Sequence, residues 1–138
     1  VYILYWSSQK LLPGYPLLEA RLNAVEASNA PFREDMNPDH HILLAQKWLK
    51  DIGFNYSEVN TFLADINSPL SENDKNALEI FFPMFWEKTK NEVSDEDWKM
   101  YKALCKPKSE DYILNKAYYY GFYTYTLFSA IRSSELLL

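Results

Sequence analysis

The sequence has 138 residues and a net charge of −5, with 48% hydrophobic and 17% aromatic residues. This composition is typical of a folded chain with ample material for a core. The acidic balance argues against nucleic acid as a partner. No run approaches the roughly 18 apolar residues of a membrane span, so we expect no membrane partner either. The single cysteine, Cys105, cannot form an internal disulfide, which favours a cytoplasmic location.

The amino-terminal part is predicted to hold a strand, a turn and a short helix. Residues 1–6 form an uninterrupted apolar run, typical of a strand buried on both faces. Residues 7–14 are predicted to break it, because they end in the turn signal Pro-Gly. The run has neither a starting Met nor the basic flank of a signal peptide, so we expect the chain to be a fragment. A helix is predicted over residues 16–27 and a loop over residues 29–38.

A helix and a strand are predicted next. Asn37 can cap the helix, and Pro38 fits its first position. Its apolar residues recur with helical spacing: Ala45, Trp48, Leu49 and Ile52. Gly53 is predicted to end the helix, with Phe54 folding back onto its last turn. Alternating side chains over residues 56–66 predict the strand.

Two further helices follow. Ser71 is predicted to open the first, in which Pro83 predicts a kink or a break. Its apolar face consists of Leu78, Phe81, Phe82 and Phe85. Ser94 and Asp97 resemble a capping box at the start of the second helix, and Pro107 ends it. The apolar face of this second helix consists of Trp98, Tyr101, Leu104 and Cys105.

The densest aromatic stretch predicts the last strand. Over residues 118–128, both alternating faces carry aromatic or β-branched side chains, which indicates a strand covered on both sides. The tail from Ser133 is expected to fray. The fold class is therefore α/β: a partial doubly wound sheet of about three strands (1–6, 56–66, 118–128) with helices packed around it, in a single domain over residues 1–138.

Three of these stretches resemble class I SAM-dependent methyltransferases. Residues 1–6 resemble the fifth strand of that family's sheet. Residues 45–54, AQKWLKDIGF, look like the following helix, which often ends in Gly-Phe. Residues 118–128 resemble the aromatic last strand of a bacterial and archaeal subgroup. The resemblance implies the carboxy-terminal, substrate-side portion of an enzyme that transfers a methyl group from SAM to a small molecule.

The resemblance also has consequences for the cofactor and the sheet. The family's glycine-rich turn and the acidic residue beyond it have no counterpart here. We therefore expect SAM to bind the parent protein and no cofactor to bind this chain, which is expected to be inactive alone. The last strand is expected to lie antiparallel between the other two, with residues 1–6 at an edge. Because an apolar edge strand offers unpaired N–H and C=O groups, we expect a homo-oligomer, other association through residues 1–6, or a companion segment there.

Candidate substrate-binding residues come from two places. Tyr5, Trp6 and Ser7 lie where the first strand is predicted to end, and open α/β sheets bind ligands at the carboxyl ends of strands. Phe82 and Trp86 lie in a helix that resembles the lid of the family. For that helix, core packing is the competing explanation.

The remaining chemical groups have simpler interpretations. His40 and His41 lack partners at metal-ligand spacing, so a solvated helical turn is expected. Cys105 on an apolar face favours a buried thiol over a nucleophile. Acidic runs such as residues 95–97 favour helix starts and solubility over acid catalysis. The alternative function is a non-enzymatic module that binds a ligand or a protein partner through its aromatic surface.

Overall fold

A computed structural model describes residues 1–132, so the predicted fraying from Ser133 lies outside the described residues. The chain forms two compact units. The first holds residues 1–9, residues 35–64 and the described residues from 123 onward. The second holds residues 10–34 and 65–122. That the chain is a single domain stays a prediction. Within the described residues, no helix is long and apolar enough to cross a membrane.

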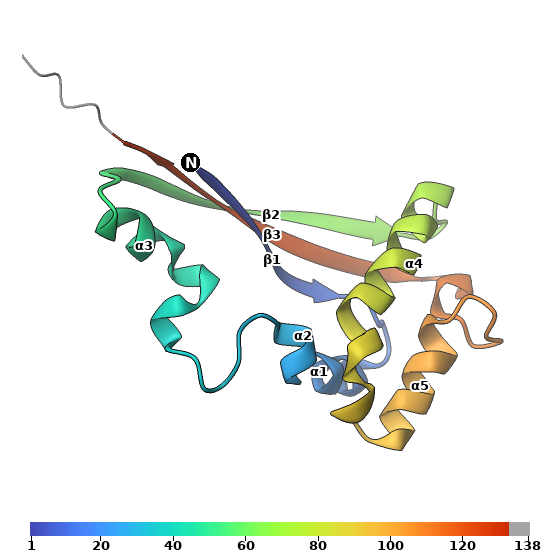
Figure 1. Cartoon of the computed structure of the whole chain (residues 1–138). Coiled ribbons are helices and arrows are strands. Elements are labelled where there is room, and N and C mark those ends of the chain that lie inside the picture. Colours follow the sequence, from blue (N-terminus) through green and yellow to red (C-terminus); the bar gives the residue numbers. More distant parts are fainter. Residues whose placement is uncertain (133–138) are drawn as a thin grey trace, which may run out of the picture. The chain divides into compact units, whose positions relative to one another are not determined.

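Three strands form one open antiparallel sheet: β1 (Tyr2–Lys10), β2 (Tyr56–Asn67) and β3 (Tyr120–Ile131). Their order is β1-β3-β2, which puts β3 in the middle (Figure 1). The structure confirms a mixed α/β fold with three strands, the last strand in the middle and the first at an edge. That the sheet is part of a doubly wound fold stays a prediction.

The first strand differs from its prediction in length and burial. It runs to Lys10 rather than ending at Trp6. The Oγ atoms of Ser7 and Ser8 both lie 2.9 Å from Oγ1 of Thr124 in β3, so pairing with a distant strand overrides the weak β-propensity of the serines. The strand is also not buried on both faces, because Tyr2 is 80% and Leu4 66% exposed.

The last strand comes closer to its prediction. Its buried residues are Gly121, Thr126, Phe128 and Ala130, and most of the others are half-buried. Being central, β3 is hydrogen-bonded on both sides, which accounts for its greater burial than that of β1.

The first unit contains one α-helix against the sheet, α3 (Ala45–Asp51). The predicted longer helix is divided: Asn37 caps a separate 3-10 turn, η1 (Pro38–His40), which is followed by η2 (Ile42–Leu44). The core cluster of this unit joins α3 to β3 through Ala45, Leu49, Phe128 and Ala130, with Ile3, Trp48 and Phe54 packed against it. Ile52, predicted on the apolar stripe, is 65% exposed beyond the helix end.

The end of α3 is as predicted. Gly53 has φ +93°, the left-handed conformation that favours glycine. Its N–H donates to the carbonyl of Lys50 at 3.0 Å, and the N–H of Phe54 donates to that of Leu49 at 2.9 Å. These two bonds form a Schellman motif, and they turn the chain toward β2.

The second unit is mainly helical (Figure 1). Its helices are α1 (Pro16–Asn23), α2 (Glu26–Asn29), α4 (Glu72–Trp86) and α5 (Asp95–Cys105), with the 3-10 turns η3 (Glu87–Asn91) and η4 (Ile113–Asn115). Ser71 opens α4 in a complete capping box with Asp74. Pro83 does not break α4, since Leu78, Phe82 and Trp86 remain on one fully buried face. Pro107 follows the end of α5 as predicted.

Candidate functional site

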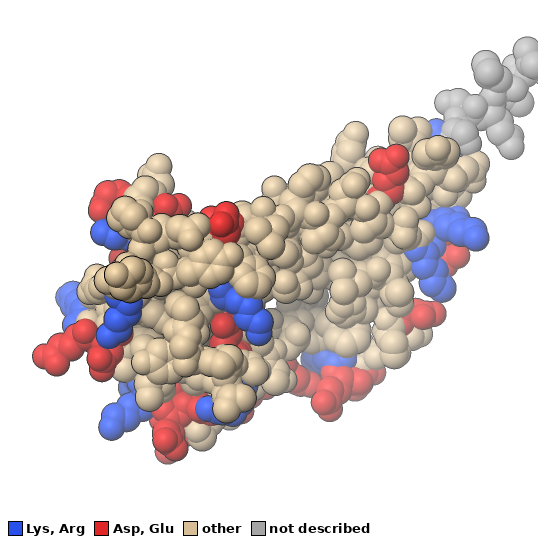
Figure 2. All heavy atoms as spheres, turned by 180° about the vertical axis from the view of Figure 1, so that it is seen from behind, with Lys and Arg blue, Asp and Glu red and all other residues tan. Residues whose placement is uncertain are grey.

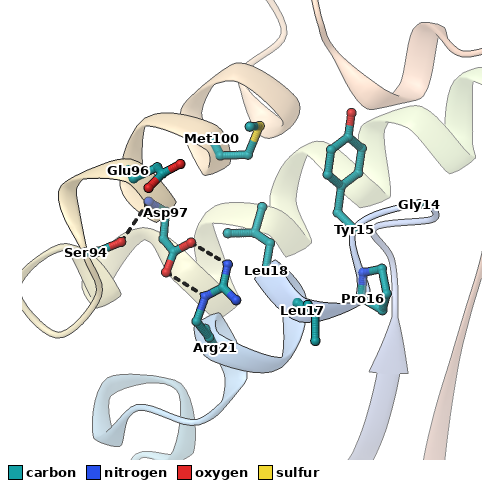
Figure 3. A pocket seen from close by; sticks show the side chains of 10 residues that line it. All are labelled: Gly14, Tyr15, Pro16, Leu17, Leu18, Arg21, Ser94, Glu96, Asp97 and Met100. Carbon is teal, nitrogen blue, oxygen red and sulfur yellow. Dashed lines mark hydrogen bonds and ion pairs between the residues drawn. The ribbon is translucent and has the colours of Figure 1, made fainter.

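The clearest concave site follows the carboxyl end of β1. After Lys10, a turn through Gly14 at φ +89° leads directly into α1. A pocket of about 620 Å³ lies there, within the second unit (Figure 3). Its lining comes from the start of α1 and the first turns of α5: Gly14, Tyr15, Pro16, Leu17, Leu18, Arg21, Ser94, Glu96, Asp97 and Met100. This volume is in the range of small-molecule sites.

One side of the pocket is apolar and accessible. Leu17 is 71% exposed, Met100 41% and Tyr15 37%, while Leu18 is buried beneath them. Leu17 lies in the first turn of α1, which begins at Pro16, a residue suited to the first helical position. Exposed leucine, methionine and tyrosine side chains in a concavity form a wall on which an apolar ligand can pack.

The opposite side carries a bidentate ion pair. Nε and Nη2 of Arg21 donate to the two carboxylate oxygens of Asp97 at 2.8 and 2.7 Å. The guanidinium holds the pKa of Asp97 below its usual range. Asp97 therefore does not complete the predicted capping box. Oγ of Ser94 accepts the backbone N–H of Asp97 at 3.1 Å, but the side chain of Asp97 turns to Arg21 and not back to Ser94. The pair fastens α5 to α1 across the pocket.

Glu96 is the remaining charged group of the lining. Its side chain is exposed and makes no hydrogen bond or ion pair within residues 1–132. It lies in the first turn of α5, where the positive end of the helix dipole favours a carboxylate. Because Arg21 and Asp97 neutralise each other, Glu96 leaves the pocket lining with one net negative charge.

A buried carboxylate fixes the turn that leads to the pocket. Glu19 of α1 is 2% exposed, and its two oxygens accept the backbone N–H groups of Leu11 and Leu12 at 2.7 and 3.2 Å. Burial raises the pKa of Glu19, while these two hydrogen bonds oppose the rise. Glu19 thus accepts the backbone N–H groups that a neighbouring strand would bond if β1 continued past its end.

The predicted residues Tyr5, Trp6 and Ser7 lie in the first unit, inside β1. The rings of Tyr5 and His41 meet edge to face at 6.5 Å, Trp6 stacks on Tyr123 at 4.3 Å, and Ser7 bonds Thr124. Their assignment relied on a strand that ended at Trp6. That predicted strand end was wrong, because the strand continues to Lys10. In chain order, the residues after the true strand end reach the pocket lining at Gly14. That these three residues bind substrate stays a prediction.

Phe82 and Trp86 belong to the second unit and are fully buried. Their rings stack at 5.9 Å, and Nε1 of Trp86 donates to Oδ1 of Asn23 at 2.8 Å. In this conformation both contribute to the core and offer no surface to a ligand. Their role in substrate binding also stays a prediction.

The other singled-out groups lie apart from the pocket lining. His40 is exposed in η1, and Nδ1 of His41 accepts the N–H of Leu43 at 3.3 Å. Within residues 1–132, no three His, Cys, Asp or Glu side chains gather as a metal site would require. Cys105 is buried, as predicted, and burial raises the pKa of its thiol.

A second pocket, of about 520 Å³, lies in the first unit beside α3. Its lining includes Lys47 and Lys50, but Lys47 already pairs with Asp51 at 2.9 Å and with Asp39 at 3.8 Å. Lys50 lies in the last turn of α3, where the helix dipole favours a cation already in place over an added anion. It is the weaker of the two candidates.

Sequence reasoning missed Tyr15, Leu17, Arg21 and Met100 as lining residues. The Pro-Gly turn at residues 13–14 was visible, but the pairing of Arg21 with Asp97 spans 76 positions and leaves no local pattern. Of the acidic run 95–97, only Glu96 and Asp97 line the pocket, and Asp97 is held in an ion pair rather than serving solubility.

Charges are mixed over the visible surface. On the face shown in Figure 2, basic and acidic groups are interspersed between broad uncharged areas.

Comparisons with protein-family models, with curated proteins and with solved structures found no match to this chain.

Proposed function

We propose that this chain is the substrate-side portion of a SAM-dependent methyltransferase that transfers a methyl group to a small molecule. The observation that carries the proposal is the strand order β1-β3-β2, with the last strand antiparallel to both neighbours. This is the order that the resemblance implies for the end of the family's sheet. The proposal includes a doubly wound sheet in the whole enzyme, of which these strands would be one side.

Two further features support it. The helix before β2 ends at Gly53-Phe54, as in the segment on which the resemblance is based. The pocket follows the carboxyl end of β1, where ligands bind in open α/β sheets. Its volume of about 620 Å³ suits a small acceptor. Methyl transfer needs an acceptor that is held in line and shielded from water more than it needs an acid or a base.

The residues present do not fit SAM. The sequence has three glycines, and the turn after β1 contains one of them, Gly14. A glycine-rich turn that lets the backbone approach a cofactor cannot be built from it. The proposal therefore assigns SAM binding to residues outside this sequence and expects the 138-residue chain to be inactive by itself.

Calorimetric titration with SAM tests the proposal. We expect no binding heat from the 138-residue chain. We expect affinity on the order of micromolar, a typical substrate range, from a protein that also carries the segment encoded upstream of Val1. That segment should contain a strand followed by a glycine-rich turn. A stop codon or an unrelated domain upstream, or SAM binding by the short chain, would contradict the proposal.

The second candidate function is an interaction module, favoured by the edge strand β1. The one charged side chain of β1 is Lys10 at its end, although charges are the usual protection of an exposed edge. With Tyr2 and Leu4 exposed, this edge can pair with another strand. A non-catalytic binding protein would need this edge and no SAM, so the titration above separates the two functions.

A further inference from the structure

We infer that the pocket at the start of α1 binds small amphipathic ammonium compounds, with an aryl or alkyl body on its apolar wall and the cation beside Glu96. The inference names a ligand class for the site. It rests on the proposed function only in so far as such a ligand would be the methyl acceptor, through an atom other than the ammonium nitrogen, which has no lone pair to take the methyl group.

The charged groups of the pocket lining favour a cationic ligand. The ionic lining consists of Arg21, Glu96 and Asp97. Arg21 uses Nε and Nη2 on Asp97, so the guanidinium's paired edge is not available to an anionic ligand. Glu96 makes no hydrogen bond or ion pair within the described residues, although its charge acts on Arg21, and it would repel an anion at the same place. The net charge of the lining therefore selects a cation.

The apolar wall of the pocket favours an organic ligand. Tyr15, Leu17 and Met100 present their side chains to the pocket beside the ion pair (Figure 3). A tyrosine face attracts cations, and a methionine thioether packs well on aromatic rings. Since Glu96 and Met100 lie one turn apart on α5, a short ligand can touch both with opposite ends. These contacts favour a compact aryl or alkyl ammonium over an inorganic cation.

Methyl NMR of the whole chain tests the inference. The probe is 2-phenylethylammonium at pH 7, compared with 3-phenylpropionate, which has a similar body and the opposite charge. We expect the ammonium to shift the methyl signals of Leu17, Leu18 and Met100, and the carboxylate to bind at least about threefold more weakly. Equal binding of the two probes, or unchanged signals at these three residues, would overturn the inference.

Two variants place the cation. Glu96→Gln should weaken binding of the ammonium about threefold to fivefold, the range of an exposed charge pair. Asp95→Asn is the matched control, because Asp95 lies in the same helical turn but does not line the pocket. The affinity of the Asp95→Asn variant for the ammonium compound should stay unchanged. Equal losses in both variants would indicate a diffuse acidic surface and contradict a site at Glu96. SAM is absent from this assay, so a negative SAM titration and a negative result here are independent.

Discussion

At the scale of single residues, Glu19 is the group with the largest expected effect. Its carboxylate accepts two backbone N–H groups while being 2% exposed. Glu19→Ala would leave both donors buried without a partner, so we expect the free energy of unfolding to fall by about 2 to 5 kcal/mol. Urea unfolding of wild type and variant measures this change in the free energy of unfolding. Glu26→Ala, an exposed glutamate of the same unit, is the control and should change little. A loss for Glu19→Ala no larger than that of the control would contradict the role of Glu19.

The same residue gives stability a definite pH dependence. Burial raises the pKa of Glu19 in the folded protein above its ordinary value of 4.5. The folded state then holds the proton of Glu19 more tightly than the unfolded state does. The stability that this proton adds to the fold is therefore complete below pH 4.5 and is lost as pH rises through the folded pKa. Glu19→Gln cannot titrate. Relative to wild type, its unfolding free energy should therefore improve as pH rises from 4.5 toward neutrality, whereas a constant difference would show that Glu19 does not titrate in this window.

At the scale of elements, local signals proved predictable and distant ones did not. Gly53 and Ser71 ended and opened helices as expected, because a helix end is determined by the few residues around it. The true end of β1 and the pair of Arg21 with Asp97 were missed, since each depends on residues far away in the sequence. Pro83 does not break α4, one of the two outcomes predicted for it, because the buried face around it favours a continuous helix. The predicted kink stays a prediction.

The carboxyl end of α3 allows a direct test of such a local signal. Gly53→Ala must adopt φ near +93° with a Cβ atom, although no atom lies within 4 Å to crowd it. We expect a loss of about 1 kcal/mol in the free energy of unfolding, caused by the backbone alone. Gly53→Asn should lose less, because asparagine tolerates this conformation better. Equal losses in the two variants would show that the left-handed backbone is not the cause.

At the scale of the whole molecule, the edge of β1 predicts self-association. Two copies of β1 can pair antiparallel about a twofold axis with uncharged side chains over most of the junction, because the one charged side chain of the strand, Lys10, lies at its end. The other edge strand, β2, carries Glu58 and Asp65, which disfavour such pairing. Light scattering on the purified chain should therefore report a dimer or a larger assembly.

Matched lysines on the two edges identify the surface. Leu4 in β1 and Leu63 in β2 are similarly exposed, 66% and 63%, so a lysine at either position should cost the fold about equally. Leu4→Lys places two like charges at a β1–β1 junction and should shift the assembly to monomer at the same concentration. Leu63→Lys should leave it unchanged. A wild-type chain that is strictly monomeric, or an assembly sensitive only at Leu63, would contradict pairing through β1. The first outcome would instead favour a separate strand as its companion.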